Sequence, residues 1–231
     1  MKLKLVTYNI HKGFAINNRR YVLEAIRDAL RRTDADVLLL QEVLGAPEQF
    51  EFIADSFWSH SAYGKNAVYS EGHHGNAILS KYPLVSWSNK IISDDSRELR
   101  GLLKMRIRLP EDGKEILLAN THLDLLQRGR DYQVENIVQD LKAEDVPWVL
   151  VGDFNDWNKK LSPVIETELG AKEAHRALHG KLARTFPSFF PVLSLDRAYV
   201  RGMKPLKVQR LMGPAWKKLS DHIPLYLELT V

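Results

Sequence analysis

Short apolar segments that end in polar residues constrain the fold of this chain more than any other feature. Val37–Leu40 and Trp148–Val151 are unbroken apolar runs, typical of strands that are buried on both faces of a sheet. The first run is followed by Gln41 and Glu42, and the second leads into Asp153. Buried strands of this kind, separated by helical segments, predict an α/β architecture.

The order amphipathic helix, polar link, apolar strand and acidic residue occurs twice, over Asn18–Glu42 and over Tyr132–Asp153. The spacing of apolar residues predicts the first helix at residues 18–32, with Asn17 or Asn18 as its cap, and the second at residues 132–141. This repetition indicates two similar halves around a shared centre.

The remaining periodic segments are mostly strands. A further helix is expected at Glu48–Phe57, and strands at Lys2–Ile10, Ala77–Leu79, Leu102–Leu109, Glu115–Leu123, Leu195–Val200, Leu206–Leu211 and Ile223–Val231. Helices separate only some of these strands, so we expect a layered α/β sandwich with two mixed β-sheets packed face to face and helices outside. Since no linker rich in Pro, Gly or Ser divides the chain, we expect a single domain over residues 1–231.

Composition excludes several classes of protein. No apolar run approaches the roughly 18 residues of a membrane-spanning helix. The chain has no cysteine, which excludes disulfides, a thiolate nucleophile and a cysteine metal site. Met1–Ile10 alternates like a strand and is too short for a signal peptide. We therefore expect a cytoplasmic monomer, with an exported form as the open alternative.

The positive charge of the chain is concentrated near its C-terminus. The whole chain has a net charge of +4, but residues 174–220 contain ten Lys or Arg and a single acid, Asp196. A basic surface favours nucleic acid or an anionic lipid surface as the partner. The alternative is a solvated basic face without a ligand.

Polar residues recur where predicted strands begin or end, which is where α/β folds place ligands. They are Asn9, Glu42, His122, Asp153, Asn155, Asp196, Asp221 and His222. Carboxylate, amide and imidazole groups without a thiolate suit Mg²⁺, Mn²⁺ or Ca²⁺. Zinc is disfavoured because the histidines lack the HExxH spacing.

Six short motifs, in this order, identify a family. They are TYNI (residues 7–10), LQE (40–42), NTHLD (120–124), GDFND (152–156), LDRAYV (195–200) and SDHIPL (220–225). Together they resemble the endonuclease/exonuclease/phosphatase superfamily, which includes deoxyribonucleases, abasic-site endonucleases, sphingomyelinases and inositol-phosphate phosphatases. The stretches at residues 9–13 and 73–84 are most similar to a small bacterial branch.

The resemblance implies catalytic roles at five positions. Asp153 and Asn155 would position or activate the attacking water and bind the phosphate. Asp196 would orient His222 and support its charge. His122 occupies a position near the phosphate.

The resemblance also implies a metal site and a phosphate-binding set. Asn9 and Glu42 would hold the metal, and Asp221 would lie beside it or hold a second ion. The residues expected near the phosphate are His11, His74, Asn76 and Arg100.

These residues suit hydrolysis of a phosphodiester by in-line attack of water. A neutral His222 backed by Asp196 is one candidate to accept the water's proton, and Asp153 is the other. We expect a Mg²⁺- or Mn²⁺-dependent phosphodiesterase, with Ca²⁺ as a further candidate ion.

The expected substrate is DNA ahead of RNA, cleaved by a weakly sequence-selective endonuclease. Aromatic residues among the C-terminal basic residues suit base stacking: Phe186, Phe189, Phe190 and Trp216. The main alternative treats residues 186–191 as an exposed apolar loop that enters a membrane, so that the substrate is a phospholipid head group. An inositol-phosphate phosphatase and a non-enzymatic binding module are further alternatives.

Overall fold

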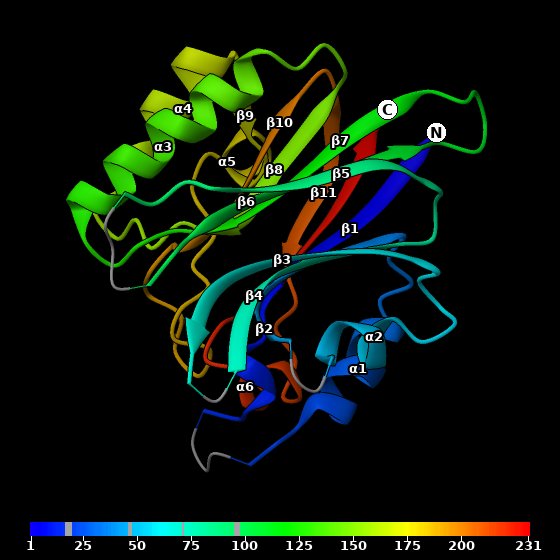
Figure 1. Cartoon of the computed structure of the whole chain (residues 1–231), viewed down its shortest axis with the longest axis vertical. Coiled ribbons are helices and arrows are strands. Elements are labelled where there is room, and N and C mark those ends of the chain that lie inside the picture. The colour runs from blue at the N-terminus through cyan, green and yellow to red at the C-terminus, as the bar shows by residue number, and fades with distance from the viewer. Residues whose placement is uncertain (17–19, 46–47, 71, 95–97) are drawn as a thin grey trace.

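The computed structural model describes residues 1–16, 20–45, 48–70, 72–94 and 98–231 and contains two six-stranded sheets (Figure 1). The first has the order β11-β12-β1-β2-β4-β3, with bounds Lys204–Arg210, Leu225–Thr230, Lys2–Asn9, Val37–Leu44, Gly72–Ser80 and His60–Tyr69. The second has the order β5-β6-β7-β8-β10-β9, with bounds Leu84–Ile91, Gly101–Arg108, Glu115–His122, Trp148–Asp153, Asp196–Arg201 and Lys172–Glu173. Both sheets mix parallel and antiparallel pairs.

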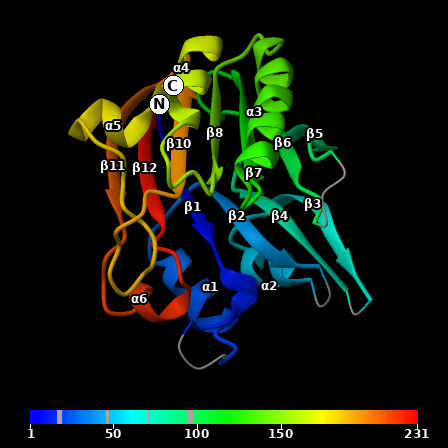
Figure 2. The same cartoon turned by 90° about the vertical axis from the view of Figure 1, so that its left-hand side faces the viewer.

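The helices lie outside the two sheets, so the predicted sandwich is confirmed (Figure 2). α1 (Leu23–Arg31) and α2 (Gln49–Ala54) cover the first sheet, and α3 (Gln127–Lys142) and α4 (Leu161–Leu169) cover the second. The short elements α5 (Ala174–His179), α6 (Trp216–Leu219) and the 3-10 turn η1 (His11–Gly13) complete the fold. No helix among the described residues is long and apolar enough to cross a membrane.

The hydrophobic core forms three layers because most strands are buried on both faces. Along β1, Leu3 and Leu5 belong to the cluster between the sheets, whereas Val6 and Tyr8 belong to the cluster under α1 and α2. A third cluster joins the second sheet to α3 and α4. Successive residues in the second half of β1 therefore enter two different apolar layers, which fixes the register of the strand.

The two similar halves are visible as two pairs of parallel strands, and in each pair a helix connects the first strand to the second. β1 is connected through α1 to β2 and pairs with it, with Asn9 opposite Gln41. β7 is connected through α3 to β8 and pairs with it, with His122 opposite Asp153. Parallel strands end at the same edge of their sheet, so the polar residues that follow each apolar run meet there.

Several elements differ from the expected ones. The first helix begins at Leu23 instead of Asn18, and its expected caps, Asn17 and Asn18, lie outside the described residues. The second helix is longer than expected and starts at Gln127. Strands β3 and β5 and helices α4 and α5 were not expected from the pattern of apolar residues.

A buried carboxylate caps α5, and its removal should destabilise the protein. Glu173 is buried and accepts hydrogen bonds from the backbone N–H groups of His175 (3.3 Å) and Arg176 (2.7 Å). We expect Glu173→Ala to lower the free energy of unfolding by about 1–2 kcal/mol in urea denaturation. The matched control is Glu168→Ala, which removes a half-exposed carboxylate and its surface pair with Lys142. An equal loss in both variants would contradict the capping role.

Candidate active site

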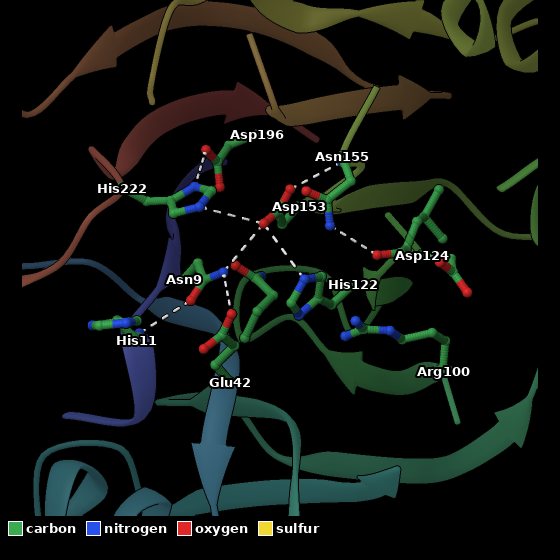
Figure 3. Close-up of polar contacts among 12 residues, drawn as sticks. Asn9, His11, Glu42, Arg100, His122, Asp124, Asp153, Asn155, Asp196 and His222 are labelled. Carbon is green, nitrogen blue, oxygen red and sulfur yellow. Dashed lines mark hydrogen bonds and ion pairs between the residues drawn. The ribbon is translucent and has the colours of Figure 1, made fainter. Parts of the chain in front are cut away.

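Side chains from both sheets converge at the ends of their central strands (Figure 3). Asn9 ends β1, and Glu42 lies in a bulge of β2 between Leu40 and Val43. From the second sheet come the residues that end β7 and β8 and begin β10: His122, Asp153 and Asp196. His222 lies just before β12. These six of the eight predicted strand-end residues thus lie together.

The Asp153 carboxylate is the centre of this site. Its Oδ2 atom accepts a hydrogen bond from Asn9 Nδ2 at 3.2 Å and lies 3.5 Å from the Nε2 atoms of both His122 and His222. Its Oδ1 atom accepts the backbone N–H of Asn155 at 3.0 Å. No acidic partner of His122 is evident from the sequence, and in the structure Asp153 is the acid beside its ring.

A second carboxylate holds the opposite side of the His222 ring. His222 Nδ1 donates to Asp196 Oδ2 at 2.8 Å, and both side chains are buried. Thr185 fixes the backbone at both residues of the Asp196–His222 pair. Its hydroxyl oxygen accepts the N–H of Asp196 (3.3 Å), and its carbonyl accepts the N–H of Ile223 (2.9 Å), the residue after His222. The Phe186 ring packs on His222, with ring centroids 5.0 Å apart. The ring is therefore fixed in position and direction.

Burial and charge set different protonation states for the two histidines. Burial lowers the pKa of His222, but the carboxylates of Asp196 and Asp153 outweigh this effect and raise the pKa to about 10. Burial lowers the pKa of His122 well below its usual range, and the positive charges of Arg100 and His222 lower it further. The two shifts therefore favour the protonated form of His222 and the neutral form of His122.

The carboxylate between the two histidines is also shifted. Burial raises the pKa of Asp153 to about 6, although the nearby charge of His222 acts in the opposite direction. Asp153 is therefore a carboxylate at pH 7 whose basicity exceeds that of an exposed aspartate. A basic group with that property suits removal of a proton from water.

Glu42 is the residue best suited to hold a divalent cation. Its backbone is left-handed (φ 54°), which together with the bulge turns the side chain into the site, where Oε1 accepts from Asn9 Nδ2 at 3.2 Å. The described residues contain no group of three or more His, Asp or Glu arranged to hold a metal ion. One accessible carboxylate with amide neighbours instead fits Mg²⁺, which keeps several water ligands.

Asn9 is oriented as a donor toward the carboxylates. Its amide nitrogen contacts both Glu42 and Asp153, while its Oδ1 accepts the backbone N–H of His11 at 3.0 Å. One lone pair of Oδ1 is thus used by the backbone, and the second stays available to a metal ion. In the present geometry, Asn9 fixes the position of the carboxylate that would bind the ion.

Asp221 is connected to Asn9 through the Ser220 hydroxyl. The Ser220 hydroxyl contacts both the carbonyl of Asn9 (2.7 Å) and Asp221 Oδ1 (3.2 Å). Among the described residues, no polar contact joins Asp221 to Glu42. Its place in a first or a second metal site stays a prediction.

The residues expected near the phosphate have different surroundings. Arg100 is buried and donates to Glu98 Oε2 at 2.8 Å, and the other oxygen of Glu98 lies 2.8 Å from His74 Nε2. Glu98, which no motif in the sequence indicates, connects the side chains of Arg100 and His74. Asn76 donates to the carbonyls of Gly101 and Asn120 and so joins strands β4, β6 and β7.

Four residues near the site hold a left-handed backbone without being glycine. They are His11, Lys12, Glu42 and Asn155, with φ between 48° and 56°. Such conformations persist only where the surrounding structure enforces them, and they cluster at functional sites. No signal in the sequence predicts them.

Two residues of the family motifs have a structural role instead. Asp156, in GDFND, and Arg197, in LDRAYV, form a fully buried ion pair with a distance of 2.8 Å. Asp156 also accepts the N–H groups of Lys160 and Leu161 at the start of α4.

Comparison with known proteins agrees with this geometry. The model of the Endonuclease/Exonuclease/phosphatase family matches residues 6–222. The chain belongs to this family. The resemblance carried by the six motifs is thereby confirmed, and the chain is a phosphoesterase of a family whose enzymes generally use divalent metal ions.

The relatives of this family member do not define its substrate. It is 42% identical over 241 residues to the uncharacterized protein YbhP of Escherichia coli K12, covering 98% of this chain and 95% of that protein. The human nocturnin catalytic domain has the same fold (TM-score 0.85, 17% identity, covering 99% of this chain and 94% of that one). Zebrafish (D. rerio) TDP2, solved with a single-strand DNA product, also matches (TM-score 0.80, 18% identity, covering 100% and 99%).

Proposed function

We propose that the protein is a divalent-metal-dependent phosphodiesterase that cleaves DNA endonucleolytically with weak sequence selectivity. The observation that carries the reaction type is the position of Asp153, whose Oδ2 atom faces Asn9, His122 and His222 together. A basic carboxylate, a cationic ring and a neutral ring around one point suit attack of water on a phosphate.

The charge state of the site assigns the roles. Asp153 accepts the proton of the attacking water, and the imidazolium of His222 donates a hydrogen bond to a phosphate oxygen. Asp196 maintains the charge and direction of His222, and His122 acts as a neutral hydrogen-bonding group beside the same phosphate. A divalent cation at Glu42 would supply neutralisation of the negative charge that develops on the phosphate oxygens.

Two features of the C-terminal region support DNA as the substrate. The ten basic residues between positions 174 and 220 surround Asp196 in sequence, although Arg197 is buried in its ion pair. Phe189 and Phe190 are exposed and available for base stacking. Phe186 and Trp216 are not available, because they pack on His222 and Tyr8 respectively. The DNA product in the TDP2 structure is consistent with this choice.

One observation favours a phospholipid head group as the second candidate substrate. The tip of the segment at residues 186–193 is apolar and exposed, with Phe189, Phe190 and Val192 exposed by 57%, 69% and 46%. An apolar tip beside basic residues also suits insertion into an anionic membrane surface.

A substrate panel at two salt concentrations separates the candidates. The panel contains plasmid, single-stranded DNA, RNA, abasic duplex, inositol phosphates and anionic phospholipid vesicles, each with Mg²⁺, Mn²⁺, Ca²⁺ or EDTA. For a nuclease, we expect nicking of plasmid whose KM rises steeply with salt, because phosphate contacts release counterions. Release of head groups from vesicles without nicking of any nucleic acid would overturn the DNA assignment.

Removal of the Glu42 charge should weaken the binding of the metal ion. We expect EDTA to abolish hydrolysis by the unmodified protein. Glu42→Gln should raise the Mg²⁺ concentration for half-maximal activity by about tenfold or more, because the amide lacks the charge of the carboxylate. Glu51→Gln, on the exposed face of α2, is the matched control and should leave the Mg²⁺ dependence unchanged. An unchanged Mg²⁺ requirement in Glu42→Gln would place the ion elsewhere.

A further inference from the structure

A cationic pocket lies away from the catalytic residues, between α5, the edge strand β11 and the segment that follows α5. Its volume is about 370 Å³, and it is lined by His175, His179, Lys181, Leu182, Arg184, Pro191 and Arg210. Figure 2 shows α5 beside β11 at the edge of the molecule. None of the residues assigned to the reaction lines this pocket.

The charges of the lining are all of one sign. Lys181, Arg184 and Arg210 supply three positive charges, and no lining residue is acidic. Within the described part of the chain, none of these three cations forms an ion pair with a carboxylate; Arg210 instead donates to the carbonyl of Arg184 at 3.1 Å. Like charges gathered without a counter-charge repel one another, and an anion bound between them would remove this cost.

The two histidines are each held by one ring N–H that donates to a backbone carbonyl, which leaves the second ring nitrogen of the neutral imidazole as an acceptor beside the cations. His175 is buried and its Nδ1 donates to the carbonyl of Lys181 at 2.7 Å, while His179 Nε2 donates to the carbonyl of Val208 at 2.9 Å. The rings are neighbours, with centroids 4.5 Å apart. A built pair of imidazoles, one of them buried, distinguishes this pocket from a surface with scattered lysines.

We propose that this pocket binds a phosphate group, separately from the reaction centre. Three positive charges match a multiply charged anion better than a single carboxylate does, and a guanidinium can bind phosphate oxygens in pairs. The ligand is either inorganic phosphate or the terminal phosphate of a nucleic acid strand, and only the second source rests on the proposed DNA substrate.

Residues 184–186 connect this pocket to the pair of Asp196 and His222. Arg184 precedes Thr185, which holds Asp196 and Ile223, and Phe186 packs on the His222 ring. A phosphate bound by Arg184 would therefore be held by the same segment that positions His222. In a strand of nucleic acid, this would place one phosphate in the pocket while a different phosphate is cleaved.

The test uses the full chain in EDTA, so that no hydrolysis occurs, and follows the ring signals of its eight histidines by NMR. The signals of His175 and His179 are assigned from single His→Asn variants. The protein is titrated with inorganic phosphate, and then with a five-residue oligothymidylate that carries or lacks a 5′-phosphate. We expect saturable shifts of the His175 and His179 signals with inorganic phosphate, with the 5′-phosphorylated oligonucleotide, or with both.

Matched variants decide whether the pocket itself binds. Lys181→Gln combined with Arg184→Gln should weaken binding at the His175 signal by about tenfold or more. The control, Lys172→Gln combined with Lys204→Gln, removes the same charge from exposed positions outside the pocket and should leave the affinity unchanged. A stronger effect of the phosphorylated oligonucleotide identifies the strand terminus as the ligand.

Two results would overturn the proposal. One is the absence of saturable shifts at both His175 and His179 with either probe, including the case in which only His122 and His222 respond. The other is an equal weakening in the two double variants, which would indicate attraction by net charge alone. Because the experiment contains no metal and measures no turnover, its failure is distinct from a failure of the DNA assignment.

Discussion

Replacement of His222 by alanine is expected to lower phosphodiester hydrolysis by about 1,000-fold or more, measured with bis-para-nitrophenyl phosphate and Mg²⁺. The variant loses the cationic ring that Asp196 and Asp153 hold between them. Asp196→Asn should retain the shape of the pair and lower turnover by about 100-fold, because the neutral amide no longer supports the imidazolium. Asp153→Asn should be as damaging as the loss of His222.

The matched control for this series is His60→Ala. His60 starts β3 and pairs with Ser80, at the opposite end of the first sheet from Glu42. We expect full activity in this variant, and urea denaturation should show that the site variants still fold. Retention of metal-dependent turnover in His222→Ala and Asp153→Asn would refute the assigned chemistry.

Loss of one partner of the buried Asp156–Arg197 pair should produce the largest loss of stability. Both side chains are 0% exposed. Arg197 also donates to Ser162 Oγ (2.8 Å) and to the carbonyl of Asp156 (2.7 Å). Asp156→Leu and Arg197→Met should each lower the free energy of unfolding by about 3–5 kcal/mol, because each leaves a charge buried without its partner.

The double variant separates this explanation from simple loss of packing. Asp156→Leu with Arg197→Met contains neither charge, so its loss of stability should be clearly smaller than the sum of the two single losses. The measurement is urea denaturation of the three variants beside the unmodified protein. Additive losses would show that burial of an unpaired charge is not the cause.

The sequence predicted the strands that are buried on both faces, because a continuous apolar run is a strong signal. It did not predict β5, whose residues are mostly exposed at the sheet edge, or β3, which also lies at an edge and contains a bulge between Lys65 and Ala67. Edge strands need not be apolar, so the pattern is weak there. Helix α4 was missed although its Pro163 lies in the first turn, where proline is tolerated.

The positions of the site residues could be predicted in part. Their place at strand ends follows from where the apolar runs stop. Their contacts do not, since Asn9 and Asp153 meet across 144 positions of the chain and belong to different sheets. The same limit applies to the supporting residues, because nothing local to Thr185 or Glu98 indicates that they hold Asp196 and Arg100.

The pairing of β1 with β12 has a consequence for synthesis of the protein. Lys2 pairs with Thr230, so β1 is synthesised long before the strand that it pairs with. Contacts between such distant residues slow folding and leave β1 open to wrong partners in the meantime. His222 emerges immediately before β12. A nascent chain therefore gains the ring of His222 and the partner strand of β1 at nearly the same point of its synthesis.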